Sequence, residues 1–126
     1  MIKKHQIISL DEVLRYDDFI FGLCAFLDDF KRSNDKYNMI KSPPKLENIK
    51  LNKKNACILA AVVHKLANDY KVDVPAWVND SMYKMPYPVF EHDTKNAKYQ
   101  EFLKKDAPAE FAEKNIFYGS RAIGRV

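Results

Sequence analysis

Ser81 and Lys84 have the spacing of the S-x-x-K pattern, in which a lysine deprotonates a nucleophilic serine one helical turn away. The pair lies in a proline-rich segment, and no partner motif of that enzyme class accompanies it. A four-residue pattern with two fixed positions also arises readily by chance. We therefore interpret this match as a coincidence rather than as a catalytic serine.

The three histidines, His5, His64 and His92, are far apart in the sequence, and none forms an H-E-x-x-H or H-x-x-E-H pair. His64 borders the apolar face of a predicted helix, where a boundary residue hydrogen-bonded through one ring nitrogen is the simpler interpretation and a ligand or general base the alternative. Neighbouring groups in 91–93 point apart in a loop, so we expect them to be solvated. The sequence predicts no metal site.

The acidic pairs at 17–18 and 28–29 are eleven residues apart on one predicted helix, a separation of ~16 Å. That distance is too long for carboxylates that share a proton, a metal or a glycosidic bond, so we expect capping and solvent-facing groups. No glycine-rich phosphate loop and no G-x-S-x-G motif is present. The sequence therefore predicts no catalytic residue and no cofactor, and it does not favour an enzyme.

The element on which the rest of the chain depends is a helix predicted at 55–70. Its apolar positions follow the 3.6-residue period and form one stripe: Leu59, Val62, Val63, Leu66, Ala67 and Tyr70. Pro75 ends any continuation of this helix, so that Trp77, the only tryptophan, can fold back as an anchor in the core.

Shorter elements are predicted on both sides of this helix. Ser9 and Glu12 form a capping box, which places a helix start at Leu10. Asp17 is the expected N-cap of a second helix that ends near Arg32, and Phe21 widens the apolar face of this helix. The stretch 33–51 is a long connection with a helical turn at 35–40. A helix at 94–105 with Phe102 facing inward, a helix at 108–114, an extended segment at 116–118 and a last turn at 120–123 complete the prediction.

Length and composition favour one all-α domain over residues 1–126. The chain is 47% hydrophobic and has only three glycines, a pattern typical of a compact orthogonal domain of about five helices with irregular proline-rich connections. No apolar run is long enough for a signal peptide or a membrane span, so we expect a cytoplasmic protein. Cys24 and Cys57 lie in helical stripes and are expected to be buried, reduced thiols.

Positive charge is concentrated in one stretch of the chain. Residues 31–54 contain eight lysines and arginines against two acidic residues, although the net charge of the whole chain is only +4. Five of these lysines are candidate polyanion contacts: Lys41, Lys45, Lys50, Lys53 and Lys54. Interleaved aromatic residues are lacking, so a solvated surface is the favoured interpretation and a nucleic-acid-binding accessory protein the alternative.

The segment 78–90 is too apolar for a solvated linker and too rich in proline for a helix. We expect irregular chain packed on the helices, with Tyr83, Tyr87 and Phe90 as a partly exposed patch. Such a patch would be covered by another protein or by a second copy of the chain. A cytosolic protein-interaction or regulatory module is the function that these observations favour.

Several segments together resemble an uncharacterised group of small bacterial helical proteins. The resemblance is carried by Phe26-Leu-Asp-Asp-Phe30, Ser42-Pro-Pro44, His64-Lys-Leu-Ala67, Val74-Pro-Ala-Trp77, Pro86-Tyr-Pro-Val-Phe90 and Pro108-Ala-Glu-Phe-Ala-Glu-Lys-Asn-Ile-Phe117. In that group the domain sometimes follows a helix-turn-helix module and occurs in toxin-antitoxin-like gene contexts, which implies an antitoxin-like role. The resemblance also implies four structural anchors: Trp77, Phe111, Asn115 and Phe117. No catalytic residue is implied, and we expect this chain to have no room for the DNA-binding module.

Overall fold

The computed structural model of the protein describes residues 9–119, which form seven α-helices, three short 3₁₀ helices and one pair of two-residue strands. The α-helices are α1 (Leu10–Arg15), α2 (Phe19–Arg32), α3 (Lys36–Ile40), α4 (Leu46–Leu51), α5 (Lys53–Asp69), α6 (Ala97–Asp106) and α7 (Ala109–Ala112). The predicted all-α fold class is confirmed. The expected turn at 120–123 and His5 lie outside the described residues.

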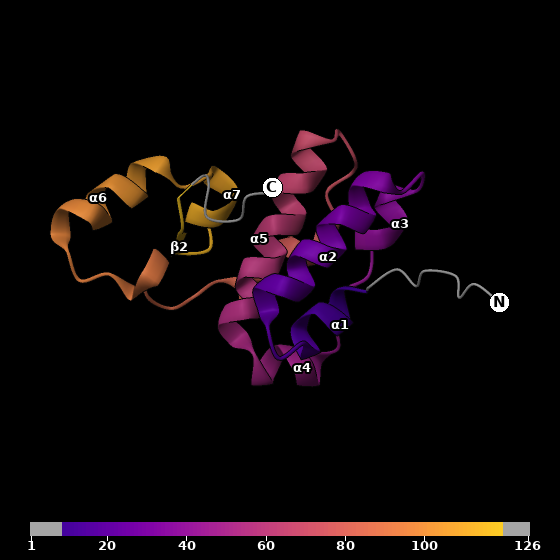
Figure 1. Cartoon of the computed structure of the whole chain (residues 1–126), viewed down its shortest axis with the longest axis horizontal. Helices are drawn as coiled ribbons and strands as arrows, with labels where there is room; N and C mark the ends of the chain where they lie inside the picture. Colours follow the sequence, from indigo (N-terminus) through magenta and orange to yellow (C-terminus); the bar gives the residue numbers. More distant parts are fainter. Residues whose placement is uncertain (1–8, 120–126) are drawn as a thin grey trace.

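Helix α5 runs through the middle of the molecule, as its continuous apolar stripe predicts (Figure 1). Ten of its residues are buried, and it contacts α1, α4 and α7 as well as the 3₁₀ helices η1 (Ala76–Asn79) and η2 (Ser81–Tyr83). A helix buried on most of its circumference needs apolar residues on every side, and the run 56–63 supplies them. The core therefore surrounds α5.

The caps of α1 and α2 follow from local sequence. The Ser9 hydroxyl accepts a hydrogen bond from the Glu12 amide at 3.2 Å, which confirms Ser9 as the N-cap and Leu10 as the start of α1. The Glu12 carboxylate accepts from the same hydroxyl at 3.3 Å. The N-cap of α2 is Asp18, whose carboxylate accepts from the Phe21 amide at 3.0 Å, so the prediction of Asp17 was wrong by one residue. Helix α2 ends at Arg32, where the sequence placed its end.

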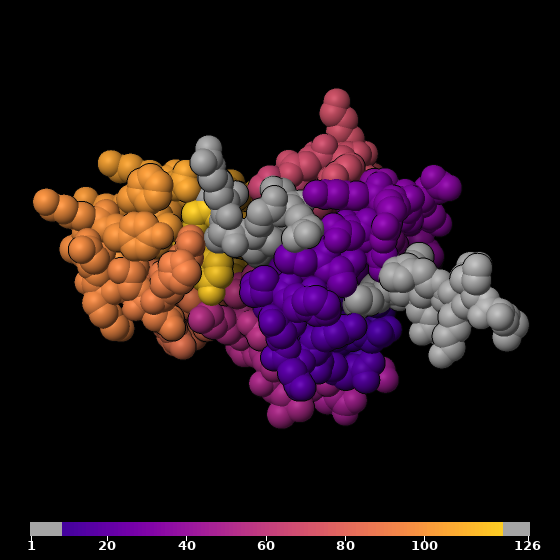
Figure 2. All heavy atoms as spheres, in the orientation of Figure 1, coloured from indigo at the N-terminus to yellow at the C-terminus, as the bar shows by residue number. Residues whose placement is uncertain are grey.

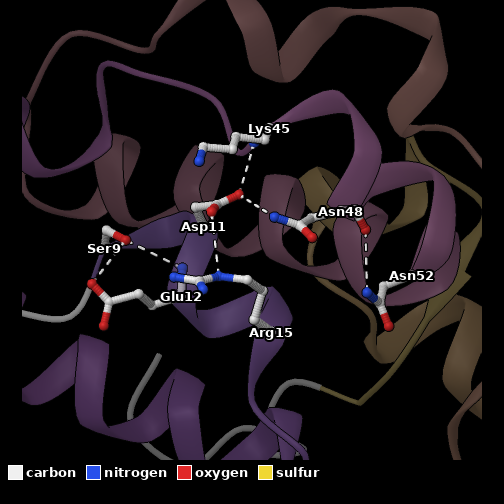
Figure 3. A network of polar contacts seen from close by, with 7 residues as sticks. All are labelled: Ser9, Asp11, Glu12, Arg15, Lys45, Asn48 and Asn52. Carbon is white, nitrogen blue, oxygen red and sulfur yellow. Dashed lines mark hydrogen bonds and ion pairs between the residues drawn. The ribbon is translucent and has the colours of Figure 1, made fainter.

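Two helices, α3 and α4, occupy the stretch that the sequence predicted as a long connection with one helical turn. Helix α4 has no side-chain cap of its own. Instead, the carboxylate of Asp11 in α1 accepts hydrogen bonds from the Lys45 amide and from the Asn48 side chain, both at 2.8 Å (Figure 3). The start of α4 is therefore stabilised by a residue 34 positions earlier in the chain.

The last third of the described chain forms a smaller part at one side of the molecule. Figures 1 and 2 show α6 projecting away from the body formed by the first five helices. Strand β1 (Val89–Phe90) pairs in parallel with β2 (Ile116–Phe117), and α6 packs on β2. The predicted extended segment is confirmed as β2, whereas β1 falls within chain that was expected to be irregular.

Three predictions of burial were wrong. Phe21 was expected to widen the core face of its helix but is 64% exposed, because the buried apolar residues of α2, at 23, 26, 27 and 30, lie on the opposite face. Asp29 was expected to face solvent but is buried, with Arg32 at 3.1 Å. Phe102 was expected to point inward but is half exposed, because α6 has only Leu103 fully in the core.

The four predicted anchors occupy different depths. Phe111 is buried, and Trp77 is partly buried with its indole nitrogen donating to the Ile40 carbonyl at 2.9 Å. Phe117 is also partly buried and stacks on Phe90 with ring centroids 5.5 Å apart. Asn115 takes a left-handed backbone conformation with φ of 62° and donates its side-chain amide to the Met85 carbonyl at 2.8 Å.

Both cysteines are free thiols. Cys57 is buried as predicted, whereas Cys24 is partly exposed. Among residues 9–119, no helix combines the length and the apolar character that crossing a membrane requires.

Candidate interaction cleft

A cleft of about 370 Å³ lies between the N-terminal end of α5, the segment 85–90 and the start of α6. Its lining combines apolar and polar side chains: Lys54, Met85, Tyr87, Pro88, Val89, Phe90, Asp93, Thr94, Lys95 and Gln100. Ligand-binding clefts are commonly of this size and composition, with apolar walls and a few polar groups at the rim. The segment that the sequence singled out as a partner surface therefore forms one wall of a cleft.

The apolar wall is presented by a stretch of chain fixed at both ends. The Met85 amide donates to the Lys114 carbonyl at 3.0 Å, and the Val89 amide donates to the Asn115 carbonyl at 2.8 Å. Between these two bonds the prolines of Pro86-Tyr87-Pro88 have no amide to donate, and all three residues are exposed. Tyr87 is 61% exposed as a result. Its outward position is set by the backbone on either side of it.

The polar rim carries two lysines and one carboxylate. The ammonium of Lys54 lies 3.8 Å from the carboxylate of Asp93, with side chains 42% and 80% exposed, so this ion pair is loose and open to solvent. Lys95 is exposed at the same rim. Lys104 lies over the ring of Phe90, with its nitrogen 5.9 Å from the ring centroid. The lining of the cleft therefore carries two ammonium groups against one carboxylate.

An unusual backbone shapes the rim. The 3₁₀ helix η3 (Glu91–Asp93) contains His92 and Asp93 with φ of 59° and 50°, the left-handed region that histidine and aspartate tolerate better than most residues. Glu91 accepts a hydrogen bond from the Gly119 amide at 2.8 Å, which ties the turn to the chain beyond β2. The predicted solvated cluster is thus a turn that places Asp93 beside Lys54.

Of the three predicted patch residues, Tyr87 and Phe90 line the cleft and Tyr83 does not. Tyr83 is only 2% exposed, because its ring packs edge-on against Trp77 with centroids 5.1 Å apart. The prediction that Tyr83 belongs to a partner surface was therefore wrong. Thr94, Lys95 and Gln100 were missed, because only folding brings the start of α6 next to 85–90.

Beneath the cleft wall lies a buried cluster of titratable groups. Burial raises the pKa of the Cys57 thiol and, with the nearby charges of Asp80 and Cys57, raises the pKa of Tyr83 to about 12. Burial also lowers the pKa of Lys114, whose ammonium donates to the Val78 carbonyl. A buried, protonated thiol is a poor nucleophile. The cluster fixes η1 and η2 against α5 and offers no accessible reactive group.

The five lysines predicted to contact a polyanion do not lie on one surface. Lys41, Lys45 and Lys50 are exposed on α3 and α4 or at their caps. Lys53 is only partly exposed and donates to the Met82 carbonyl, whereas Lys54 belongs to the rim of the cleft. Three exposed lysines remain of the predicted five.

The other candidates for chemistry stay apart from the cleft. Ser81 and Lys84 are exposed and do not line it. The Nδ1 atom of His64 is buried without a hydrogen-bond partner among the described residues. The expected hydrogen bond through one ring nitrogen stays a prediction. Within residues 9–119 no three histidine, cysteine or acidic side chains are grouped as a metal site would require.

Comparison of the chain with protein-family models, with curated proteins and with solved structures finds no match. The resemblance described above and the function that it implies therefore stay predictions.

Proposed function

We propose that the protein is a cytoplasmic protein-interaction module of regulatory, antitoxin-like character that binds another protein at the cleft. The observation that carries the proposal is Tyr87, which is 61% exposed at the mouth of a cleft while the chain on both sides of it is hydrogen-bonded to the core. Tyrosines in such positions are typical anchors of protein interfaces, because they bury a large apolar ring and keep a polar tip.

The rest of the cleft supports the same function. Its apolar wall continues from Tyr87 to Phe90, and its rim carries groups that can form charge-assisted hydrogen bonds, Lys54 and Lys95. A central apolar contact surrounded by polar groups is the usual anatomy of a protein interface. The antitoxin-like part of the proposal rests on the resemblance alone and predicts a partner whose activity falls on binding.

The test is affinity capture with the tagged protein from the cells that produce it, at low and at high salt. The wild type should retain a stoichiometric protein at high salt, and Tyr87→Ser should lose it. Tyr37→Ser is the matched control, because Tyr37 is 41% exposed on α3 and does not line the cleft. Equal capture by the wild type and Tyr87→Ser would contradict the proposal.

The same experiment tests the alternative. Nucleic acid that elutes as salt rises would indicate a polyanion-binding protein, because counterion release makes phosphate contacts strongly salt-dependent. The exposed lysines at 41, 45 and 50 would then be the contacts to reverse in charge.

A further inference from the structure

A second surface of the molecule carries an exposed aromatic side chain surrounded by acidic residues. At the corner between α1 and α2, Tyr16, Ile20 and Phe21 are 39%, 45% and 64% exposed. The rings of Tyr16 and Phe21 lie next to each other with centroids 6.3 Å apart. This α1–α2 corner, residues 16–21, is an exposed apolar surface on which Phe21 is the most exposed of the three side chains, and it lies beside an open hollow lined by Glu12, Arg15, Tyr16 and Asp17.

The corner is held in this form by its own contacts. The Asp18 carboxylate caps the first turn of α2 by accepting from the Phe21 amide, which fixes the backbone that carries the ring. Tyr16 packs directly over Gly22, where a Cβ atom would lie 2.9 Å from the tyrosine ring. The backbone that carries Phe21 is therefore fixed at the start of α2, and its ring is exposed to solvent.

The charges of the two surfaces are opposite. Around the corner lie three carboxylates, Glu12, Asp17 and Asp18, and one guanidinium, Arg15, which is itself paired with Asp11 at 3.4 Å. The lining of the cleft carries the ammonium groups of Lys54 and Lys95 and the carboxylate of Asp93. Lys104 and Glu91 lie next to Phe90, so the lysines around the cleft exceed the carboxylates by one. Opposite potentials favour encounter and fix the relative orientation of two surfaces.

We propose that the cleft receives Phe21 from the α1–α2 corner of a second copy of this chain, with Asp17 of that copy facing Lys95. At about 370 Å³ the cleft is large enough for one aromatic side chain. The inference rests on the proposed function, because it assigns a binding partner to the same cleft. Since the two surfaces differ, the contact is heterologous, and a pair of copies keeps one free corner on one copy and one free cleft on the other.

Sedimentation velocity over a concentration series at low salt tests this inference with three full-length proteins. The wild type should grow beyond dimers as its concentration rises, because heterologous contacts propagate unless they close into a ring. Phe21→Ser and Tyr87→Ser should each remain monomeric. An equimolar mixture of the two variants should form a complex that stops at one copy of each, because only one intact corner and one intact cleft remain.

A charge exchange tests the orientation. Lys95→Glu should weaken association of the wild-type surfaces, and Asp17→Lys in the other copy should restore it. Tyr37→Ser should associate like the wild type. A monomeric wild type, or a mixture of Phe21→Ser and Tyr87→Ser that stays monomeric, would overturn the inference. If the wild type is monomeric but Tyr87→Ser loses a different protein in the affinity capture, only the second copy is excluded as the occupant of the cleft, and the proposed function remains. If Tyr87→Ser also captures as much protein as the wild type, the inference and the proposed function both fail.

Discussion

Asn115 connects the backbone of the cleft wall to the core more directly than any aromatic residue. Its φ of 62° lies in the left-handed region, and its side chain holds the Met85 carbonyl at 2.8 Å. Asparagine tolerates this conformation better than residues that lack a short polar side chain. The resemblance implied a packing role for Asn115, whereas its backbone conformation could not be predicted from the sequence.

Two substitutions of Asn115 separate its roles. Asn115→Gly should lose the side-chain hydrogen bond, about 1 kcal/mol of unfolding free energy, and keep the backbone conformation. Asn115→Ala should lose roughly 1 kcal/mol more, because alanine is strained at positive φ. Urea unfolding followed by circular dichroism measures both. Equal stability of the two variants would show that the backbone conformation is not a constraint.

Trp77 combines a ring contact with a hydrogen bond. Trp77→Phe keeps an aromatic ring beside Tyr83 but removes the donor to Ile40, which should lower the unfolding free energy by about 1 kcal/mol. Trp77→Ala also removes the ring and should cost roughly 3 kcal/mol. The same urea unfolding experiment checks the order. A melting temperature of Trp77→Ala close to that of the wild type would contradict the anchoring role.

At the scale of elements, the contact between α1 and α4 depends on one carboxylate. Partial burial raises the pKa of Asp11, but hydrogen bonds from Asn48 and Lys45 and the charges of Arg15 and Lys45 outweigh burial, so the pKa is lowered overall (Figure 3). A carboxyl group with a lowered pKa contributes stability above its unfolded pKa of 3.8, and this contribution is lost as pH falls through the folded pKa.

Asp11→Asn should therefore reduce the unfolding free energy at pH 7 by about 1–2 kcal/mol, because hydrogen bonds to a charged acceptor become neutral ones. The difference from the wild type should shrink as pH falls from about 3.8 through the lower, folded pKa of Asp11. Asp73→Asn is the control, since Asp73 is exposed and lies outside this contact. A difference that stays constant down to low pH would argue against the charge as its cause.

The elements differ in how far local sequence determines them. Helix α5 could be predicted from the spacing of its apolar residues, and the start of α1 from Ser9 and Glu12, which are three residues apart. Helix α4 was missed because its start is stabilised by Asp11, a residue far away in the chain. Strand β1 was missed for a similar reason, because Val89 becomes a strand residue only by pairing with Ile116. Local patterns cannot indicate partners that folding alone brings together.

At the scale of the whole molecule, the candidate site joins segments that are distant in sequence. Its tyrosine was predicted, because Pro86-Tyr87-Pro88 stands out as apolar chain that cannot be helical. The rim could not be predicted, since Lys54 comes from the start of α5 and Lys95 from the approach to α6. The basic stretch was predicted as one surface, but the fold divides it between α3, α4, the core and the cleft.

The central claim is that partners bind at the cleft. Hydrogen–deuterium exchange of the protein, free and in complex with the partner that it captures, tests this claim most directly. If partners bind at the cleft, amides in 87–95, where the cleft wall and rim lie, should exchange more slowly in the complex. Protection confined to 41–50, with exchange at 87–95 unchanged, would place the partner on the exposed lysines instead of the cleft.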